Sequence, residues 1–258
     1  MVTFERAQAV IFDLDDTLLS NWPEPGGRGL HEISRLEAIH SVGQRRSLDG
    51  LTKVTPAQNL EAFLSAPNHS RESAVWQILR QTQLVPDREE IDPNNELLVE
   101  IVELKDQIHS TILAERGVAV PGAPEFVRNL IAAGLTNMAI ASTAIRRDID
   151  LSLQILGLTD LFPSERIISH ELLTYTKPNP ESFNLAFATL GLPEAARPYT
   201  WVFEDDPRGI TAARAAGLFV CAITTRFSRA KLEALPVAPD VVAGSFAEFS
   251  QLLEVPQT

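Results

Sequence analysis

Short apolar runs alternate with helical patterns along most of this chain, and this alternation restricts the possible folds more than any other feature. Five runs have the length and composition of buried strands, at residues 9–12, 137–141, 166–169, 200–203 and 218–223. Amphipathic helical patterns lie between them, at residues 123–133, 147–156, 180–190 and 208–216. Strands that alternate with helices in this way form βαβ units. The sequence therefore predicts an α/β fold with a doubly wound parallel sheet.

One stretch, residues 20–117, interrupts the alternation. It shows helical periodicity, as in the apolar stripe Leu97, Ile101, Leu104, Ile108 and Ile112, and it contains no convincing strand. Connections between a strand and a helix usually have about two to six residues, so this stretch is too long to be a loop. We expect an inserted α-helical cap domain at 20–117, and an α/β core at 1–19 and 118–258.

The composition excludes several classes of protein. Hydrophobic residues make up 45% of the chain and charged residues 22%, which is typical of a domain with a sizeable core. The formal net charge of −12 repels polyanions, so we expect no nucleic acid and no membrane surface as partner. The single cysteine, Cys221, excludes a disulfide framework and a multi-thiolate zinc site. No apolar run reaches the ~20 residues of a membrane span, and we expect a cytoplasmic protein.

Acidic residues follow the first predicted strand directly, in the order Asp13, Leu14, Asp15, Asp16. In extended backbone, residues two apart point the same way, so Asp13 and Asp15 are expected to face one cleft. Two carboxylates held close together repel each other unless a cation neutralises them, and a hard divalent ion prefers oxygen ligands. The alternative is a cluster that caps a helix N-terminus.

Polar residues also follow three later strands. Ser142 and Thr143 come after 137–141, where their hydroxyls suit phosphate oxygens or a helix N-cap. Lys177 precedes a helix that starts with proline, where it suits a bound anion or merely solvent. Glu204, Asp205 and Asp206 follow 200–203 and repeat the repulsion of the first cluster. Open parallel sheets bring the ends of their strands together at one edge. A Mg²⁺ ion shared by the two acidic clusters would therefore offset the charge repulsion in both.

Together, these positions resemble the motifs of the haloacid dehalogenase-like hydrolase superfamily. The matching residues are Asp13-x-Asp15-x-Thr17, Ser142, Lys177-Pro178 and Glu204-Asp205. The resemblance is closest to the branch with a helical cap after the first motif, which includes phosphoglycolate phosphatases and β-phosphoglucomutase. It covers residues 5–19 and 118–245, and the cap by position and helical character. It implies a Rossmann-like core.

The resemblance implies a role for each position. Asp13 would be the nucleophile that forms an aspartyl-phosphate, and Asp15 the general acid and base. The phosphoryl group would be held by Ser142 and Lys177, with Thr143 beside Ser142. The implied Mg²⁺ ligands are Asp13, Asp15 through its backbone carbonyl, Asp205, and Glu204 in support.

Two positions depart from the family pattern. Asp16 replaces the glycine common in the first motif, and Asp206 replaces a small residue in the fourth, where it adds to metal binding or faces solvent. Dehalogenases and phosphonate hydrolases of the superfamily lack an acid at the Asp15 position. Phosphonate hydrolases instead use a lysine of the cap, and Lys53 is a candidate for that lysine because of its place in the predicted cap. The presence of Asp15 therefore favours phosphate chemistry.

Two residues of the predicted cap resemble substrate-binding elements of β-phosphoglucomutase and its relatives. His31 lies in one such element, although it suits a helix surface equally well. Lys53 stands where an arginine is expected, and lysine lacks the bidentate geometry of arginine.

We therefore expect a Mg²⁺-dependent phosphatase that hydrolyses a small phosphorylated metabolite, a sugar or organic phosphate, through an aspartyl-phosphate. A sugar phosphomutase of the β-phosphoglucomutase type is the alternative, because the two reactions differ only in whether water or a sugar accepts the phosphoryl group. A receiver-like phospho-switch would be about half as long with its phosphoacceptor on a middle strand, and an inert binding protein would have lost a catalytic position. The motifs leave the substrate and the oligomeric state open.

Overall fold

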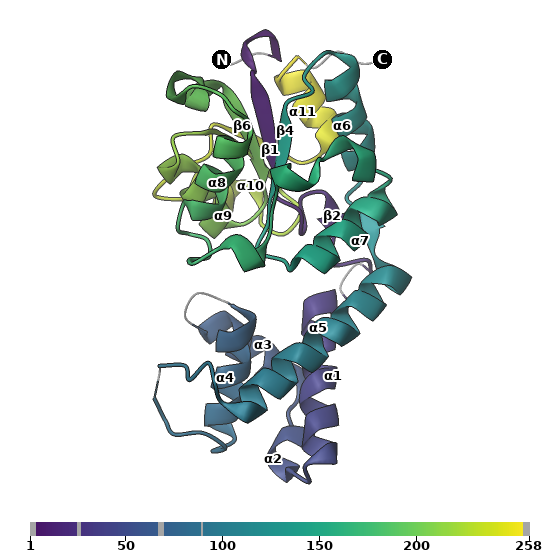
Figure 1. Cartoon of the computed structure of the whole chain (residues 1–258), viewed down its shortest axis with the longest axis vertical. Coiled ribbons are helices and arrows are strands. Elements are labelled where there is room, and N and C mark those ends of the chain that lie inside the picture. Colours follow the sequence, from purple (N-terminus) through teal and green to yellow (C-terminus); the bar gives the residue numbers. More distant parts are fainter. Residues whose placement is uncertain (1–3, 25–26, 67–69, 89, 255–258) are drawn as a thin grey trace. The chain divides into compact units, whose positions relative to one another are not determined.

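The computed structural model describes residues 4–24, 27–66, 70–88 and 90–254. The chain divides into two compact units, which are the α/β unit of residues 1–20 and 117–258 and the helical unit of residues 21–116 (Figure 1). In the described residues, no helix combines the length and the apolar character that crossing a bilayer requires.

The α/β unit contains one parallel sheet of six strands in the order β5-β4-β1-β6-β7-β8. The strands are β1 (Ala9–Phe12), β4 (Met138–Ala141), β5 (Ile167–Ile168), β6 (Thr200–Glu204), β7 (Phe219–Ile223) and β8 (Val241–Ala243). The first strand is central, with β4 on one side and β6 on the other. This arrangement confirms the predicted doubly wound α/β fold, and the reversal of strand order beside β1 is where such sheets bind ligands.

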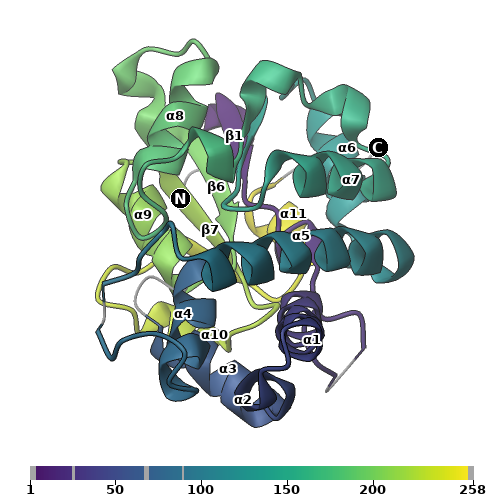
Figure 2. The ribbon, with the colours of Figure 1, turned by 60° about the horizontal axis from the view of Figure 1, so that its bottom comes forward.

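Helices cover both faces of the sheet. They are α6 (Ala123–Ala132), α7 (Arg146–Leu156), α8 (Glu181–Thr189), α9 (Pro207–Ala215), α10 (Arg229–Glu233) and α11 (Phe246–Leu252), and short 3₁₀ turns lie at Phe4–Arg6, Thr159–Leu161, Ser164–Arg166, His170–Leu172 and Glu194–Tyr199. Figures 1 and 2 both show α8 and α9 on one face and α6 and α11 on the other.

Alternating side chains of the strands explain why both faces are covered. Ile11 belongs to the apolar cluster that includes Phe183 of α8 and Ile210 of α9. The next residue, Phe12, points to the opposite face and stacks on Phe203 of β6 with ring centroids 5.2 Å apart. Phe203 in turn packs against Phe126 of α6 at 5.1 Å. A strand buried on both faces must be apolar throughout, as β1 is.

The structure adds elements that were not predicted, among them helices α10 and α11, and it shortens others. Strand β8 was not predicted, because its three residues form too short an apolar run to stand out. Strand β5 covers only two of the four residues predicted at 166–169. An antiparallel pair, β2 (Leu19–Ser20) and β3 (Val118–Ala119), lies where the chain leaves and re-enters the α/β unit.

The helical unit has its own core. Its helices are α1 (Leu30–Arg45), α2 (Asp49–Thr52), α3 (Pro56–Ser65), α4 (Arg71–Gln81) and α5 (Glu96–Arg116). Leu36 and Ile39 of α1 pack in one apolar cluster with Trp76 of α4 and Ile101 of α5. An independent core is what allows this many helical residues to be inserted between two strands.

Candidate active site

Pairing of β1 with β6 places acidic residues side by side at the carboxyl edge of the sheet. Phe12 is paired with Phe203, and the backbone N–H of Asp13 donates to the carbonyl of Phe203 at 3.0 Å. The residue after each member of this pair is an acid, Asp13 on one strand and Glu204 on the other. The predicted meeting of strand ends therefore occurs at adjacent positions of two hydrogen-bonded strands.

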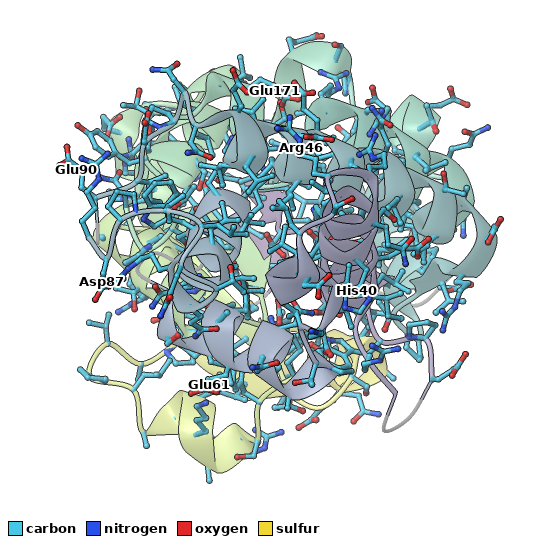
Figure 3. The ribbon with its side chains drawn as sticks, turned by 90° about the horizontal axis from the view of Figure 1, so that it is seen from below. His40, Arg46, Glu61, Asp87, Glu90 and Glu171 are labelled. Atoms are coloured by element: carbon cyan, nitrogen blue, oxygen red, sulfur yellow. The ribbon has the colours of Figure 1, made fainter. Side chains whose placement is uncertain are left out.

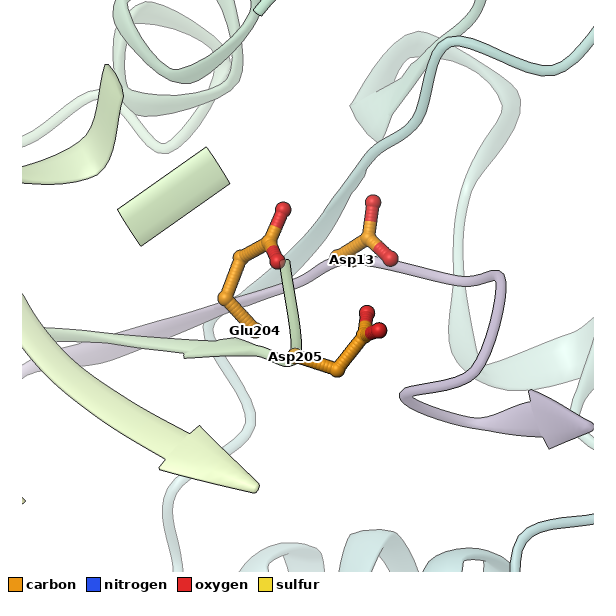
Figure 4. A group of neighbouring side chains, drawn as sticks. All are labelled: Asp13, Glu204 and Asp205. Carbon is orange, nitrogen blue, oxygen red and sulfur yellow. The ribbon is translucent and has the colours of Figure 1, made fainter. Parts of the chain in front are cut away.

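Three buried carboxylates gather at this edge. Asp13, Glu204 and Asp205 each offer an oxygen, and these oxygens all lie within 4.8 Å of one another (Figure 4). As whole residues, they are at most 7% exposed. We call these three residues the inner acids.

Lys177 binds two of the inner acids. Its Nζ lies 2.6 Å from Asp13 Oδ1 and 2.6 Å from Glu204 Oε1, and it sits 4.7 Å from the centroid of the Phe183 ring. Burial by itself would lower the pKa of Lys177, but the charges of Asp13 and Glu204 outweigh burial and raise that pKa above its ordinary value. Lys177 is therefore held as a fixed positive charge among the inner acids.

The pKa values of two inner acids rise. Burial raises the pKa of Asp13 well above its ordinary 3.8, Lys177 opposes the rise, and Glu204 adds to it. Burial also raises the pKa of Asp205 well above 3.8, and the neighbouring carboxylates, first Glu204 and then Asp16, Asp13 and Asp206, add to this rise. Burial is the largest cause of both rises and the neighbouring carboxylates add to it, so a cation bound in the site would favour the ionised forms.

The chemistry of the inner acids fits a divalent metal ion. When all are ionised, three carboxylates and Lys177 leave two negative charges, which a dication would balance. Thr17 Oγ1 donates to Asp205 Oδ1 at 3.3 Å, whereas the buried Asp205 Oδ2 accepts no hydrogen bond from the described residues. A buried oxygen of this kind needs a partner, and carboxylate oxygens are the ligands that Mg²⁺ prefers.

The other predicted residues of the α/β unit have more varied surroundings. Asp15 is half-buried, and its carboxylate is not one of the three that lie within 4.8 Å of one another. Ser142, buried after β4, accepts a hydrogen bond through Oγ from the N–H of Ala144 at 3.1 Å. Thr143 is exposed. The alternative in which Ser142 or Thr143 is the N-cap is wrong, because the N-cap of α7 is Ile145.

The two residues that depart from the family pattern have structural explanations. Asp16 has a φ of 60°, a left-handed conformation that glycine adopts without strain and that aspartate tolerates better than most residues. Asp206 neither joins the inner acids nor simply faces solvent. It is the N-cap of α9, accepting from Arg208 N at 2.8 Å, and its carboxylate also pairs with Arg208 Nε at 3.0 Å. We call Asp16 and Asp206 the outer acids.

The sequence did not single out Gly209 or Arg226 as part of this site. A Cβ on Gly209 would lie 1.6 Å from Glu204 Oε1, so α9 can approach Glu204 only because this residue is glycine. Arg226 follows β7 and pairs with both outer acids. Its position three residues beyond the last strand residue, Ile223, is the signal that would have found it.

The predicted cap residues lie in the helical unit. His31 stacks on His109 with ring centroids 3.9 Å apart and the rings nearly parallel. Lys53 is exposed and pairs with Asp49 one helical turn away at 3.3 Å. Arg46, labelled in Figure 3, binds Glu100 through Nε at 2.6 Å. The roles of His31 and Lys53 toward a substrate stay predictions.

Comparisons with known proteins identify the family. The sequence model described as haloacid dehalogenase-like hydrolase matches residues 7–217. Protein CbbY of Rhodobacter capsulatus is 27% identical over 233 residues, which are 86% of this chain and 87% of that protein. Beta-phosphoglucomutase of Mycobacterium tuberculosis is 27% identical over 235 residues, which are 88% of this chain and 84% of that protein. The solved structure of a CbbY mutant from Rhodobacter sphaeroides with xylulose-(1,5)bisphosphate has a TM-score of 0.66 at 20% identity, covering 94% of this chain and 96% of that one.

Proposed function

The chain belongs to the haloacid dehalogenase-like hydrolase family, and from this premise we propose that it is a Mg²⁺-dependent phosphatase. It hydrolyses a small phosphorylated metabolite, a sugar or organic phosphate, through an aspartyl-phosphate on Asp13. The observation that carries this proposal is the contact of the buried Asp13 carboxylate with Lys177, beside Glu204 and Asp205. A buried carboxylate paired with a lysine is a fixed nucleophile next to a fixed positive charge for the phosphoryl oxygens.

The proposed reaction has two steps. In the first, an oxygen of Asp13 attacks phosphorus, the bond from phosphorus to the ester oxygen breaks, and Asp15 gives its proton to that oxygen, which leaves as an alcohol. In the second, Asp15 takes a proton from water, the water oxygen attacks phosphorus, and the bond to Asp13 breaks. Inorganic phosphate leaves, and both carboxyl groups return to their starting states.

The phosphoryl group brings negative charge into a site that already has an excess of it. Lys177 and Ser142 are proposed to hold its oxygens, with Thr143 at the same strand end. Mg²⁺ would be held by Asp13, Asp205 and the Asp15 carbonyl, with Glu204 in support, and it would supply the positive charge that lets an anion approach the inner acids. The Asp205 Oδ2 atom accepts no hydrogen bond from the described residues, and this supports Asp205 as a ligand of the metal.

Sugar phosphates are the first substrates to test. A CbbY structure contains xylulose-(1,5)bisphosphate, and another relative is a β-phosphoglucomutase. His31 and Lys53 are proposed to contact the part of the substrate that is not transferred. The similarity to β-phosphoglucomutase over 88% of this chain also keeps phosphomutase activity as a second candidate.

One experiment separates these possibilities. The purified protein is incubated with a panel of phosphorylated sugars and organic acids, with Mg²⁺ or with EDTA, and both free phosphate and isomerised sugar phosphate are measured. Phosphatase activity predicts free phosphate only with Mg²⁺ and none from Asp13→Asn. Isomerised product without free phosphate would establish the mutase. Phosphate release by Asp13→Asn at the wild-type rate would contradict the proposed nucleophile.

A further inference from the structure

Arg226 connects the two outer acids. It lies in the loop after β7, with Nε 3.5 Å from Asp16 Oδ2 and a terminal nitrogen 3.7 Å from Asp206 Oδ2. Asp16 follows β1 and Asp206 follows β6, so one side chain joins the loops of three neighbouring strands. The Arg226 side chain is 28% exposed, so its charge is partly shielded from solvent at the edge of the sheet.

The outer acids are in a position to disturb the metal site. Asp206 is adjacent in sequence to the inner acid Asp205, and the side chain of Asp16 is 7% exposed. Unbalanced carboxylates so close to the inner acids would compete for a cation and would repel an anionic substrate. Both outer acids are paired with arginine instead, Asp206 with Arg208 and Arg226, and Asp16 with Arg226.

We propose that Arg226 is a positioning residue that balances the outer acids and keeps them out of the metal site. The five carboxylates of the two sets and their three cations, Lys177, Arg208 and Arg226, leave two negative charges among these described residues. That remainder equals the charge of one divalent ion. This inference rests on the proposed function, because that function supplies both the cation and the anionic ligand.

Loss of the Arg226 charge has effects of opposite sign on the two ligands. One additional negative charge near the inner acids attracts Mg²⁺ and repels phosphate. Damage to the local structure would weaken the binding of both. The signs of the two changes therefore distinguish an electrostatic role from a merely structural one.

The test measures binding by titration calorimetry at fixed ionic strength, first of Mg²⁺ to the metal-free protein and then of inorganic phosphate at saturating Mg²⁺. In Arg226→Ala, we expect Mg²⁺ to bind roughly three- to tenfold more tightly and phosphate to bind weaker by a similar factor. Arg226→Gln, which keeps the length and loses the charge, is expected to do the same and replaces the alanine variant if that variant does not fold. Arg226→Lys keeps the charge, and both constants are expected within about twofold of wild type.

Two further variants complete the test. The double variant D16G/R226A removes one outer acid together with the arginine that pairs with it, which leaves the charge balance unchanged, and it is expected to bring both constants back toward wild type. Arg214→Ala is the matched control, because Arg214 is also a partly exposed arginine paired with an aspartate, Asp240, whose carboxylate accepts from Val220 N near the start of β7. It is expected to change neither constant.

The outcomes separate this inference from the proposed function. If Arg226→Ala and Arg226→Gln bind both Mg²⁺ and phosphate more weakly, or if neither binding constant changes, the role of Arg226 is overturned and the metal site is not. Failure of the wild-type protein to bind Mg²⁺ would overturn the metal site and the role of Arg226 together. Opposite changes that the double variant D16G/R226A does not reverse would also contradict the charge balance.

Discussion

The inner and outer acids occupy the same edge of the sheet, but their counter-charges differ. Asp13, Glu204 and Asp205 have Lys177 among them, whereas Asp16 and Asp206 are paired with Arg226 and Arg208. The first set is therefore short of positive charge and the second is not. We therefore propose that the shortage of cations, and not the proximity of carboxylates alone, makes the inner acids a metal site.

The repulsion among the inner acids is large. Two unit charges 4.8 Å apart, the upper limit for the inner acids, repel by about 3.5 kcal/mol at an effective dielectric constant of about 20. Lys177 offsets part of this repulsion, and burial together with the remaining repulsion raises the pKa values of Asp13 and Asp205. The outer acids are expected to contribute local structure, because N-capping and ion pairing already use their charge.

The largest expected effect is that of Asp13→Asn. Asparagine keeps the shape of the side chain but lacks the carboxylate that we propose attacks phosphorus, so we expect phosphate release to fall by about 10⁴-fold or more. The variant is expected to melt at or above the wild-type temperature without metal, because it removes one repelling charge. Phosphate release and thermal unfolding are measured together. The matched outer-acid variant, Asp16→Asn, is expected to lose less than about fivefold.

Lys177→Met is expected to have the second largest effect. Removal of one partner from a buried ion pair leaves uncompensated carboxylates, which is expected to lower the free energy of unfolding by about 3–5 kcal/mol in metal-free buffer. Added Mg²⁺ is expected to restore part of this loss by binding the same carboxylates. Urea denaturation with EDTA and with Mg²⁺ measures both. Lys231→Met, at an exposed lysine of α10, is the control and is expected to change stability by less than about 0.5 kcal/mol.

Gly209→Ala tests how tightly the inner acid Glu204 is packed. The new Cβ would overlap Glu204 Oε1, so Glu204 must leave Lys177 or α9 must move. We expect a loss of about 2–3 kcal/mol of stability and a clear loss of Mg²⁺ affinity, measured by urea denaturation and calorimetry. Gly244→Ala, where the nearest atom is the Glu248 carboxylate at 3.3 Å, is the control. Equal tolerance of both substitutions would mean that Glu204 is free to move.

The pH dependence of stability follows from Asp205. Its pKa is raised above 3.8 in the folded protein, so the folded state holds the proton more tightly than the unfolded chain. The resulting stabilisation is present below about pH 3.8 and is lost as the pH rises through the raised pKa. In EDTA, Asp205→Asn is therefore expected to gain stability relative to wild type as the pH rises.

Addition of Mg²⁺ is expected to reverse that order. The ion is expected to bind and stabilise the ionised wild-type site, and to bind the asparagine variant less well. Unfolding free energies of the two proteins at several pH values, with EDTA and with Mg²⁺, provide the measurement. A difference between them that does not vary with pH would contradict the raised pKa.

The sequence predicted the fold and the place of the inner acids because both depend on local patterns. Apolar runs that end abruptly in acids identify the strands and, since parallel strands end at one edge, bring Asp13 and Asp205 together. The short β8 carries too few residues for such a pattern. Arg226 was missed because no cluster accompanies it, and its role depends on two acids that are distant in sequence.

Asp16→Gly is expected to have the smallest effect and to distinguish the two sets of acids most finely. Glycine relieves the left-handed conformation at φ 60°, a gain of up to about 1 kcal/mol, and loss of the loose pairing with Arg226 offsets part of it. We expect a net change in unfolding free energy within about 1 kcal/mol. One negative charge fewer is expected to weaken Mg²⁺ binding and tighten phosphate binding by about threefold, opposite to Arg226→Ala. Because the two variants change the same charge balance in opposite directions, shifts of the same sign in both would show that the outer acids do not act through charge.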